Sequence, residues 1–223
     1  MTNKALVAAF LLSSAGLMQA AAIVAYDYPA LASSGSGANF GNQSFGQALG
    51  MDFNINQAIS ILSLGAFDSG QDGFQSTITV RLYDRTTQLP VTGLITLSSS
   101  DTLIHGGRFQ TLLSPITLQA GFQGTIVAYG YSAAEFNGNI GQGGTFNPAT
   151  LNTGGGAITF LTSASFGGTG YPSTSFAAGV GNQFGAGSFT FNLAGTATPE
   201  PATLGTIAFG LLALGAARFR RKV

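Results

Sequence analysis

Apolar residues alternate with polar or small residues along several short segments of this chain. Residues 49–55 read Leu-Gly-Met-Asp-Phe-Asn-Ile, and the same period of two recurs at 78–82 and 189–193. Because successive side chains of a β-strand point to opposite faces, this pattern predicts strands with one buried face. No segment of the body has a sustained helical period, so we expect an all-β fold.

The spacing of further apolar runs indicates the architecture. Further apolar runs lie at 59–67, 91–97, 109–113, 116–118 and 125–129. With these runs, the expected number of strands is about eight or nine. Such spacing is typical of an antiparallel β-sandwich, jelly-roll-like in form, which we assign to residues 23–195. Phenylalanine, with 18 residues in a chain that has no Trp, is expected to supply much of the core.

The second half of the body is poor in charge and rich in glycine. Residues 137–198 contain no Asp, Glu, Lys or Arg, and the chain has 33 glycines in total. This composition favours turns and long loops between strands. A disordered tract is the alternative for residues 137–152, whereas 157–161 and 188–193 have the composition of ordered strands.

The N-terminus has the three parts of a secretory signal peptide. Lys4 provides a positive charge, residues 5–12 are apolar but too short to span a membrane, and Gln-Ala-Ala-Ala at 19–22 offers small residues for cleavage. We therefore predict a signal peptide helix within residues 1–22, removed before Ile23. Cleavage after Ala20 is the alternative.

The C-terminus combines an apolar run with a basic end. Residues 202–217 carry no charge and would span roughly 24 Å as a helix, short of a bilayer core of about 30 Å. The basic residues that follow can reach the headgroups and make up the missing length; they are Arg218, Arg220, Arg221 and Lys222. Because such residues stay on the cytoplasmic side, this pattern predicts a single transmembrane helix with the body outside.

Pro199-Glu200-Pro201 stands directly before this helix. The motif, the short helix and the arginine-rich end, in that order, resemble the PEP-CTERM sorting signal, which we place at residues 196–223. The resemblance implies an exosortase as partner, transient membrane association through the helix, processing near the motif, and a final place at the cell surface or in the extracellular matrix. An ordinary tail anchor that remains uncut is the alternative.

The neutral total charge of the chain hides an acidic body. Residues 23–200 contain three arginines, Arg81, Arg85 and Arg108, against eight carboxylates, a net charge of −5. Nucleic-acid binding needs a clustered basic face, so it is not expected here. The absence of cysteine excludes disulfides, thiol chemistry and cysteine metal sites.

Several segments of the body are similar to a recurrent extracellular β-sandwich module that precedes PEP-CTERM tails. They cover 64–74, 80–84, 114–121 and 157–160, and the similarity extends over about residues 48–193. That module often carries His and Trp around the strand at Val80, where this chain has Thr79 and Tyr83. A function tied to those side chains is therefore not implied.

The loop at residues 68–73 is the best candidate metal site. Asp68 and Asp72 lie four residues apart among glycines, and their oxygens would suit Ca²⁺. The loop is not an EF-hand, because Gly70 and Thr79 occupy positions where such a loop needs ligands. A strand-connecting turn, with no cofactor, is the alternative.

Catalytic candidates are few, and we expect no enzyme. His105 is the only histidine, and no Gly-x-Ser-x-Gly motif accompanies it in the body. Glu135 is the only glutamate before the tail, so a pair of carboxylates for glycoside hydrolysis would be arbitrary.

Two functions remain for the body. The first is a non-enzymatic structural component of the surface or matrix, associated with exopolysaccharide. The second is a carbohydrate-binding module, with or without calcium, that uses exposed tyrosines as stacking platforms. The candidate platforms are Tyr26, Tyr28, Tyr83, Tyr129, Tyr131 and Tyr171.

Overall fold

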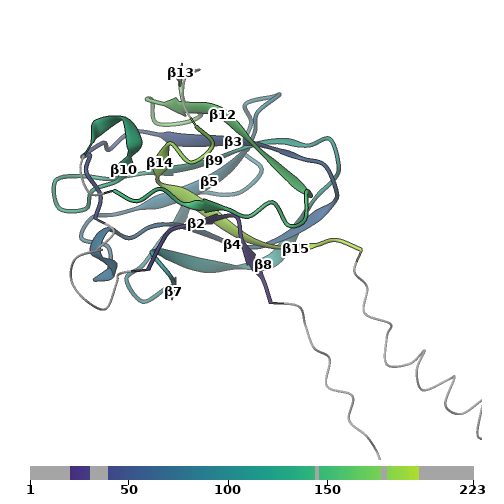
Figure 1. The fold of residues 1–223 in the computed structure, drawn as a ribbon, viewed down its shortest axis with the longest axis horizontal. Helices are drawn as coiled ribbons and strands as arrows, with labels where there is room; N and C mark the ends of the chain where they lie inside the picture. The colour runs from purple at the N-terminus through teal and green to yellow at the C-terminus, as the bar shows by residue number, and fades with distance from the viewer. Residues whose placement is uncertain (1–20, 31–39, 144–145, 177–179, 196–223) are drawn as a thin grey trace, which may run out of the picture. The chain divides into compact units, whose positions relative to one another are not determined.

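Two antiparallel β-sheets pack face to face to form the body (Figure 1). The computed structural model describes residues 21–30, 40–143, 146–176 and 180–195, which belong to one unit spanning Ala21–Gly195. The predicted signal peptide, apart from its last two residues, and the predicted sorting signal lie outside the described residues. Within the described part, no helix is long and apolar enough to cross a membrane.

One sheet has five strands in the order β1-β15-β4-β8-β7. Their bounds are Ile23–Val24 for β1, Gly187–Leu193 for β15, Ile59–Phe67 for β4, Gly107–Leu118 for β8 and Thr102–Ile104 for β7. The longest strand, β8, replaces the two runs predicted at 109–113 and 116–118. Residues 112–115 of β8 bulge out of the ladder with β4, so Pro115 removes no ladder hydrogen bond there.

The other sheet has six strands in the order β13-β12-β3-β9-β5-β6. Their bounds are Thr174–Phe176 for β13, Ile158–Phe166 for β12, Leu49–Ile55 for β3, Gln123–Tyr129 for β9, Thr79–Asp84 for β5 and Ile95–Thr96 for β6. The run predicted at 91–97 is therefore strand only at Ile95–Thr96, near its C-terminal end. The prediction of an all-β body is confirmed for the described residues.

Two short strand pairs and two 3₁₀ turns complete the body. β2 (Tyr26–Asp27) pairs with β11 (Thr150–Leu151), and β10 (Gly138–Asn139) pairs with β14 (Phe184–Gly185). The 3₁₀ turns are η1 (Ser69–Gln71) and η2 (Ile140–Gln142). The described part of 137–152 thus contains strands and a turn, instead of the disordered tract considered above.

The core lies between the two sheets and is rich in aromatic rings. Phe53 of β3 meets Phe189 of β15 across the interface, with ring centroids 5.1 Å apart. The inward residues of β3 are buried as the period of two predicted. The outward residues Gly50 and Asp52 are also buried, contrary to the expectation of a solvated face, because Pro172 and its loop lie over Gly50.

The pair β10-β14 is held close to the sandwich by a ring. Gly138 and Gly185 face each other in register, and a Cβ on either residue would come within 2.1–2.6 Å of the Phe146 ring. Only glycine leaves space for that ring, and the small sheet therefore lies flat against it. β14 of this pair lies beside β3 (Figure 1), near the cavity described below.

Candidate functional site

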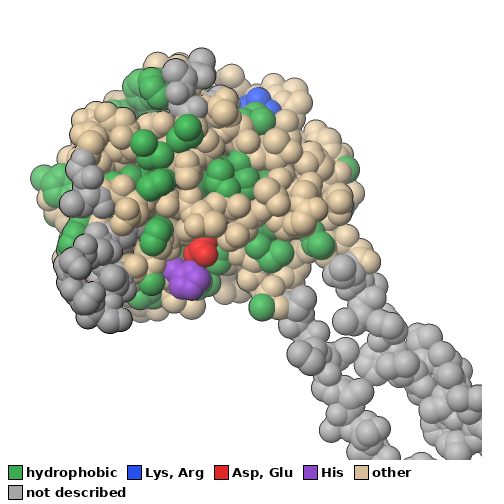
Figure 2. Space-filling view, viewed as in Figure 1, with side chains coloured by type: hydrophobic (Ala, Val, Ile, Leu, Met, Phe, Trp, Pro, Cys, Tyr) green, Lys and Arg blue, Asp and Glu red, His purple; other side chains and the backbone are tan. Residues whose placement is uncertain are grey.

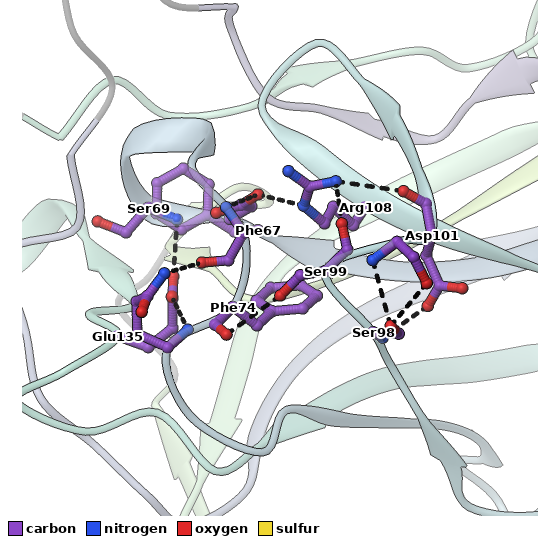
Figure 3. Close-up of polar contacts among 12 residues, drawn as sticks. Phe67, Ser69, Phe74, Ser98, Ser99, Asp101, Arg108 and Glu135 are labelled. Atoms are coloured by element: carbon purple, nitrogen blue, oxygen red, sulfur yellow. Dashed lines mark hydrogen bonds and ion pairs between the residues drawn. The ribbon is translucent and has the colours of Figure 1, made fainter.

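Asp68 lies at the end of β4 with its side chain completely buried. Its Oδ2 accepts hydrogen bonds from Arg108 Nε at 2.5 Å and from the Gly73 backbone N–H at 3.2 Å. Arg108 also donates from Nη1 to the carbonyl oxygens of Ser99 and Asp101 (Figure 3). Burial raises the pKa of the Asp68 carboxyl, although the Arg108 guanidinium opposes this rise. The pair joins β4, β8 and the loop at 98–101.

Asp72, the second predicted calcium ligand, lies at the surface. Its carboxylate is close enough to add to the rise in the pKa of Asp68, but Asp68 is already bound to Arg108. Among the described residues there is no group of three or more His, Asp or Glu that could hold a metal ion. Gly70 and Gly73 have φ angles of 83° and 95°, as expected in a tight turn. Calcium binding by Asp68 and Asp72 stays a prediction, and this geometry favours the turn.

Glu135 was not predicted to have a role, yet it fastens this turn. Its Oε1 accepts the backbone N–H of Ser69 at 2.8 Å, and its Oε2 accepts that of Gln75 at 2.9 Å (Figure 3). The side chain is 1% exposed. Burial raises the pKa of Glu135 to about 7, and the nearby Asp68 and Asp72 add to the rise. The only sequence signal for this residue is that it is the single glutamate before the tail.

His105 forms a hydrogen bond with a carboxylate that is distant in sequence. Its Nδ1 lies 2.6 Å from Asp27 Oδ1, and the histidine side chain is 57% exposed. His105 occupies the turn between β7 and β8 with a φ of 49°. The contact therefore fixes a loop histidine against β2, which agrees with the loop position expected from the sequence.

The prediction that exposed tyrosines form stacking platforms is wrong for five of the six residues. Tyr26, Tyr28, Tyr83, Tyr129 and Tyr131 are buried, and Tyr171 alone is partly exposed. Two of the buried hydroxyl groups donate to carbonyl oxygens inside the protein: Tyr28 Oη to Gly187 at 3.1 Å, and Tyr131 Oη to Phe67 at 3.0 Å. A stacking platform must be open to a ligand, so these rings do not form one.

Tyr83 and Tyr129 lie on the outer face of the six-stranded sheet but are covered. Their hydroxyl groups are 2.9 Å apart, and Tyr129 Oη donates to the Gly170 carbonyl at 2.7 Å. The loop that contains Gly170 and Tyr171 packs over both rings, with the Tyr83 and Tyr171 centroids 5.6 Å apart. This loop was not recognised as a cover, because a glycine-rich segment says little about where it packs.

A further candidate is a cavity of about 370 Å³ where the six-stranded sheet meets the β10-β14 pair. Among the described residues, its lining combines aromatic rings with side-chain amides and has no charged group. The lining residues are Gln43, Phe45, Leu49, Asn139, Gly141, Gln142, Phe166, Phe176, Gln183 and Phe184. Phe45 and Phe166 form an edge-to-face pair with centroids 6.0 Å apart, and the Phe176 ring of β13 is exposed.

Three of the lining amides form a continuous hydrogen-bonded chain. Gln183 Nε2 donates to Asn139 Oδ1 at 2.8 Å, and Asn139 Nδ2 donates to Gln43 Oε1 at 3.0 Å. Asn137 Nδ2 donates to the same Gln43 oxygen at 2.9 Å, and the Gly141 backbone N–H donates to Asn139 Oδ1 at 2.9 Å. We call Gln43, Asn139 and Gln183 the amide chain.

The amide chain was not identified from sequence, because its members are widely separated along the polypeptide. The only available signal was the composition of the second half, where polar side chains without charge replace charged ones. Figure 2 shows few charged side chains on the face that it presents, where hydrophobic side chains are scattered among other uncharged side chains and backbone.

Comparison with protein families tests the C-terminal prediction directly. The model described as "PEP-CTERM protein-sorting motif" matches residues 197–222, which include Pro199-Glu200-Pro201, the apolar run and the basic end. The predicted sorting signal is thereby confirmed. A comparison with curated proteins finds no match to the chain.

Proposed function

We propose that this chain, which carries a PEP-CTERM sorting motif, is a non-enzymatic protein of the cell surface or extracellular matrix that associates with exopolysaccharide. The observation that carries the proposal is the motif at residues 197–222. It implies an exported, membrane-anchored precursor that is processed by an exosortase, itself a membrane protein. The proposed structural role among polysaccharides rests on the properties of the body.

The tail is suited to brief residence in the membrane. The apolar run at 202–217 is shorter than an ordinary membrane helix, and the basic residues from Arg218 to Lys222 would hold it with the body outside. The two prolines of the motif would disfavour a helix at the residues that precede them. A membrane-bound processing enzyme would find an accessible, non-helical stretch beside the bilayer.

The use of charged groups in the body supports a non-enzymatic role. Asp68 is bound to Arg108, and Glu135 accepts two backbone N–H groups of a turn. Both carboxylates therefore hold loops together, whereas a catalytic acid or base must face a substrate. The cavity described above is lined by residues that do not titrate.

Cell fractionation tests the proposal. In the native host, the mature protein is expected in the exopolysaccharide fraction, with an N-terminus at Ala21 or Ile23 and without residues 202–223. Deleting the exosortase should leave the tail-bearing protein in the membrane fraction. An intact Met1 in a cytoplasmic fraction would contradict export, and a processed protein that washes freely from the polysaccharide would contradict the matrix association.

A carbohydrate-binding module, with or without calcium, is the second candidate. The tyrosine platforms do not support it, since five of them are buried. The uncharged, aromatic cavity at the amide chain does support it.

A further inference from the structure

The hydrogen atoms of the amide chain can be assigned from a single backbone group. The Gly141 backbone N–H can only donate, so the Asn139 atom that it meets must be the oxygen Oδ1. Gln183 must then present its Nε2 to that oxygen, and Asn139 must present its Nδ2 to Gln43 Oε1. The orientation of all three amides follows from this one contact.

This assignment leaves one unused atom at each end of the amide chain. The free donor is Gln43 Nε2 and the free acceptor is Gln183 Oε1; neither has a hydrogen bond to any residue that the structure describes. Gln183 is 6% exposed and lines the cavity, and Gln43 lines it as well. These two ends give the cavity one hydrogen-bond donor and one acceptor that a ligand or water can use.

The backbone around the amide chain is held in place before any ligand arrives. Gln43 and Asn137 exchange backbone hydrogen bonds of 3.0 and 2.8 Å, and the Gln183 carbonyl accepts the Ile140 N–H at 3.1 Å. Binding would therefore order few side chains, which lowers its entropic cost.

The cavity offers apolar surface next to these polar ends. Phe45 and Phe166 form one wall, and Phe176 is exposed at the rim. A pyranose ring has the matching character, since C–H groups cover its faces and hydroxyl groups that both donate and accept surround its edge. The volume of about 370 Å³ lies at the small end of the usual range for ligand cavities, roughly 300–1,000 Å³.

We infer that this cavity binds a terminal uncharged sugar of a glycan, with its hydroxyl groups on Gln43 Nε2 and Gln183 Oε1 and its C–H face against the phenylalanines. Uronic acids and phosphorylated sugars are disfavoured, because no lining residue that the structure describes carries a positive charge to compensate a buried anion. The inference rests on the proposed function for the source of the glycan and specifies the sugar class that the body would recognise.

Saturation-transfer NMR and calorimetry with defined probes test the inference. The probes are methyl glycosides of glucose, galactose and mannose, with methyl galacturonoside as the charged counterpart, added to the full-length protein in detergent. At least one neutral glycoside should bind at millimolar concentration or tighter, and methyl galacturonoside should bind at least about tenfold more weakly. Failure of all neutral glycosides to bind, or equal binding of the uronoside, would overturn the inference.

Two variants, each with its own control, test whether binding occurs in this cavity. Gln183→Ala removes the free acceptor and should weaken binding about tenfold, whereas Gln57→Ala, at an exposed position on another loop, should leave it unchanged. If Gln183→Ala does not fold, Phe176→Ala decides the question, because that ring is exposed and its loss should spare the fold. Leu113→Ala, another exposed apolar position, is its control. Unchanged binding in a folded Gln183→Ala or Phe176→Ala protein would contradict the assignment.

The two proposals can fail separately. A protein that reaches the matrix but binds no neutral glycoside would overturn the sugar site and leave the sorting function standing. A protein that binds neutral glycosides in the cavity but is never exported would overturn the proposed function and leave the site standing.

Discussion

Arg108 Nε lies 2.5 Å from Asp68 Oδ2, and the two side chains are 12% and 0% exposed. The contact spans 40 residues of sequence and joins the end of β4 to β8. The loop proposed from sequence as a calcium site is thus built around an internal ion pair. Removing either partner would leave the other without its counter-charge.

Replacing Arg108 by methionine should destabilise the body strongly. Asp68 would remain buried without its partner, and breaking a buried pair in this way costs about 3–5 kcal/mol. Urea denaturation of Arg108→Met measures the loss, and Arg81→Met, on the outer face of β5, is the matched control. The double variant Asp68→Asn with Arg108→Met should recover part of the stability. A loss as small as that of the control would show that the pair contributes little.

Stability should fall as the pH rises from about 4.5 to 7. The pKa of Glu135 is raised from its usual 4.5 to about 7 in the folded protein, so the folded state binds more protons than the unfolded state across this window. The raised pKa of Asp68 acts in the same direction. We expect a loss on the order of 2 kcal/mol, measured by urea denaturation at pH 4.5, 6 and 7.5.

The variant Glu135→Gln separates this effect from others. It imitates the protonated acid and cannot titrate, so its stability should change less between pH 4.5 and 7 than that of the parent protein. The free energy of unfolding of this variant will also drop, because the side-chain amide must place its own N–H against a backbone N–H of the turn. Only the pH dependence of stability therefore identifies the titrating group. An identical pH dependence in both proteins would rule out Glu135 as the titrating group.

Calcium should leave the melting temperature unchanged if the loop is a plain turn. Asp68 is occupied by Arg108 and Asp72 stands at the surface, so the geometry offers Ca²⁺ few ligands. Differential scanning calorimetry with millimolar Ca²⁺ and with a chelator makes the comparison. A rise in Tm with Ca²⁺ that disappears in Asp72→Asn would establish the calcium site instead, by the linkage of binding to folding.

The Pro199-Glu200-Pro201 motif should be needed for processing but not for export. Replacing Pro199 and Glu200 by alanine removes the carboxylate and one of the two prolines that disfavour a helix there, so the processing enzyme should lose its recognition element. Immunoblots of membrane and surface fractions should show the full-length variant retained in the membrane. If the alanine variant still reaches the surface without its tail, the motif is not the recognition element.

The basic end provides the matched control for that experiment. Removing Arg220, Arg221 and Lys222 leaves the motif intact but weakens the barrier to translocation of the short helix. This variant should therefore lose its fixed topology, which protease accessibility of the C-terminus measures.

The local sequence was sufficient for the features that depend on neighbouring residues. The alternation at 49–55 predicted β3 and its buried face, because side-chain direction in a strand follows from residue order alone. The sorting motif could be recognised for a similar reason, since its motif, apolar run and basic end follow one another directly and act in that order.

Only the tertiary structure decided which distant residues meet. The six tyrosines looked equally available in sequence, but five became buried when the sheets packed and the loop carrying Gly170 and Tyr171 covered β5 and β9. The amide chain joins Gln43, Asn139 and Gln183 from three separate segments, and no local pattern encodes such a meeting. Period and composition describe which face of a strand is apolar, whereas the partners of a buried polar group depend on strand order and loop packing, which are properties of the whole fold.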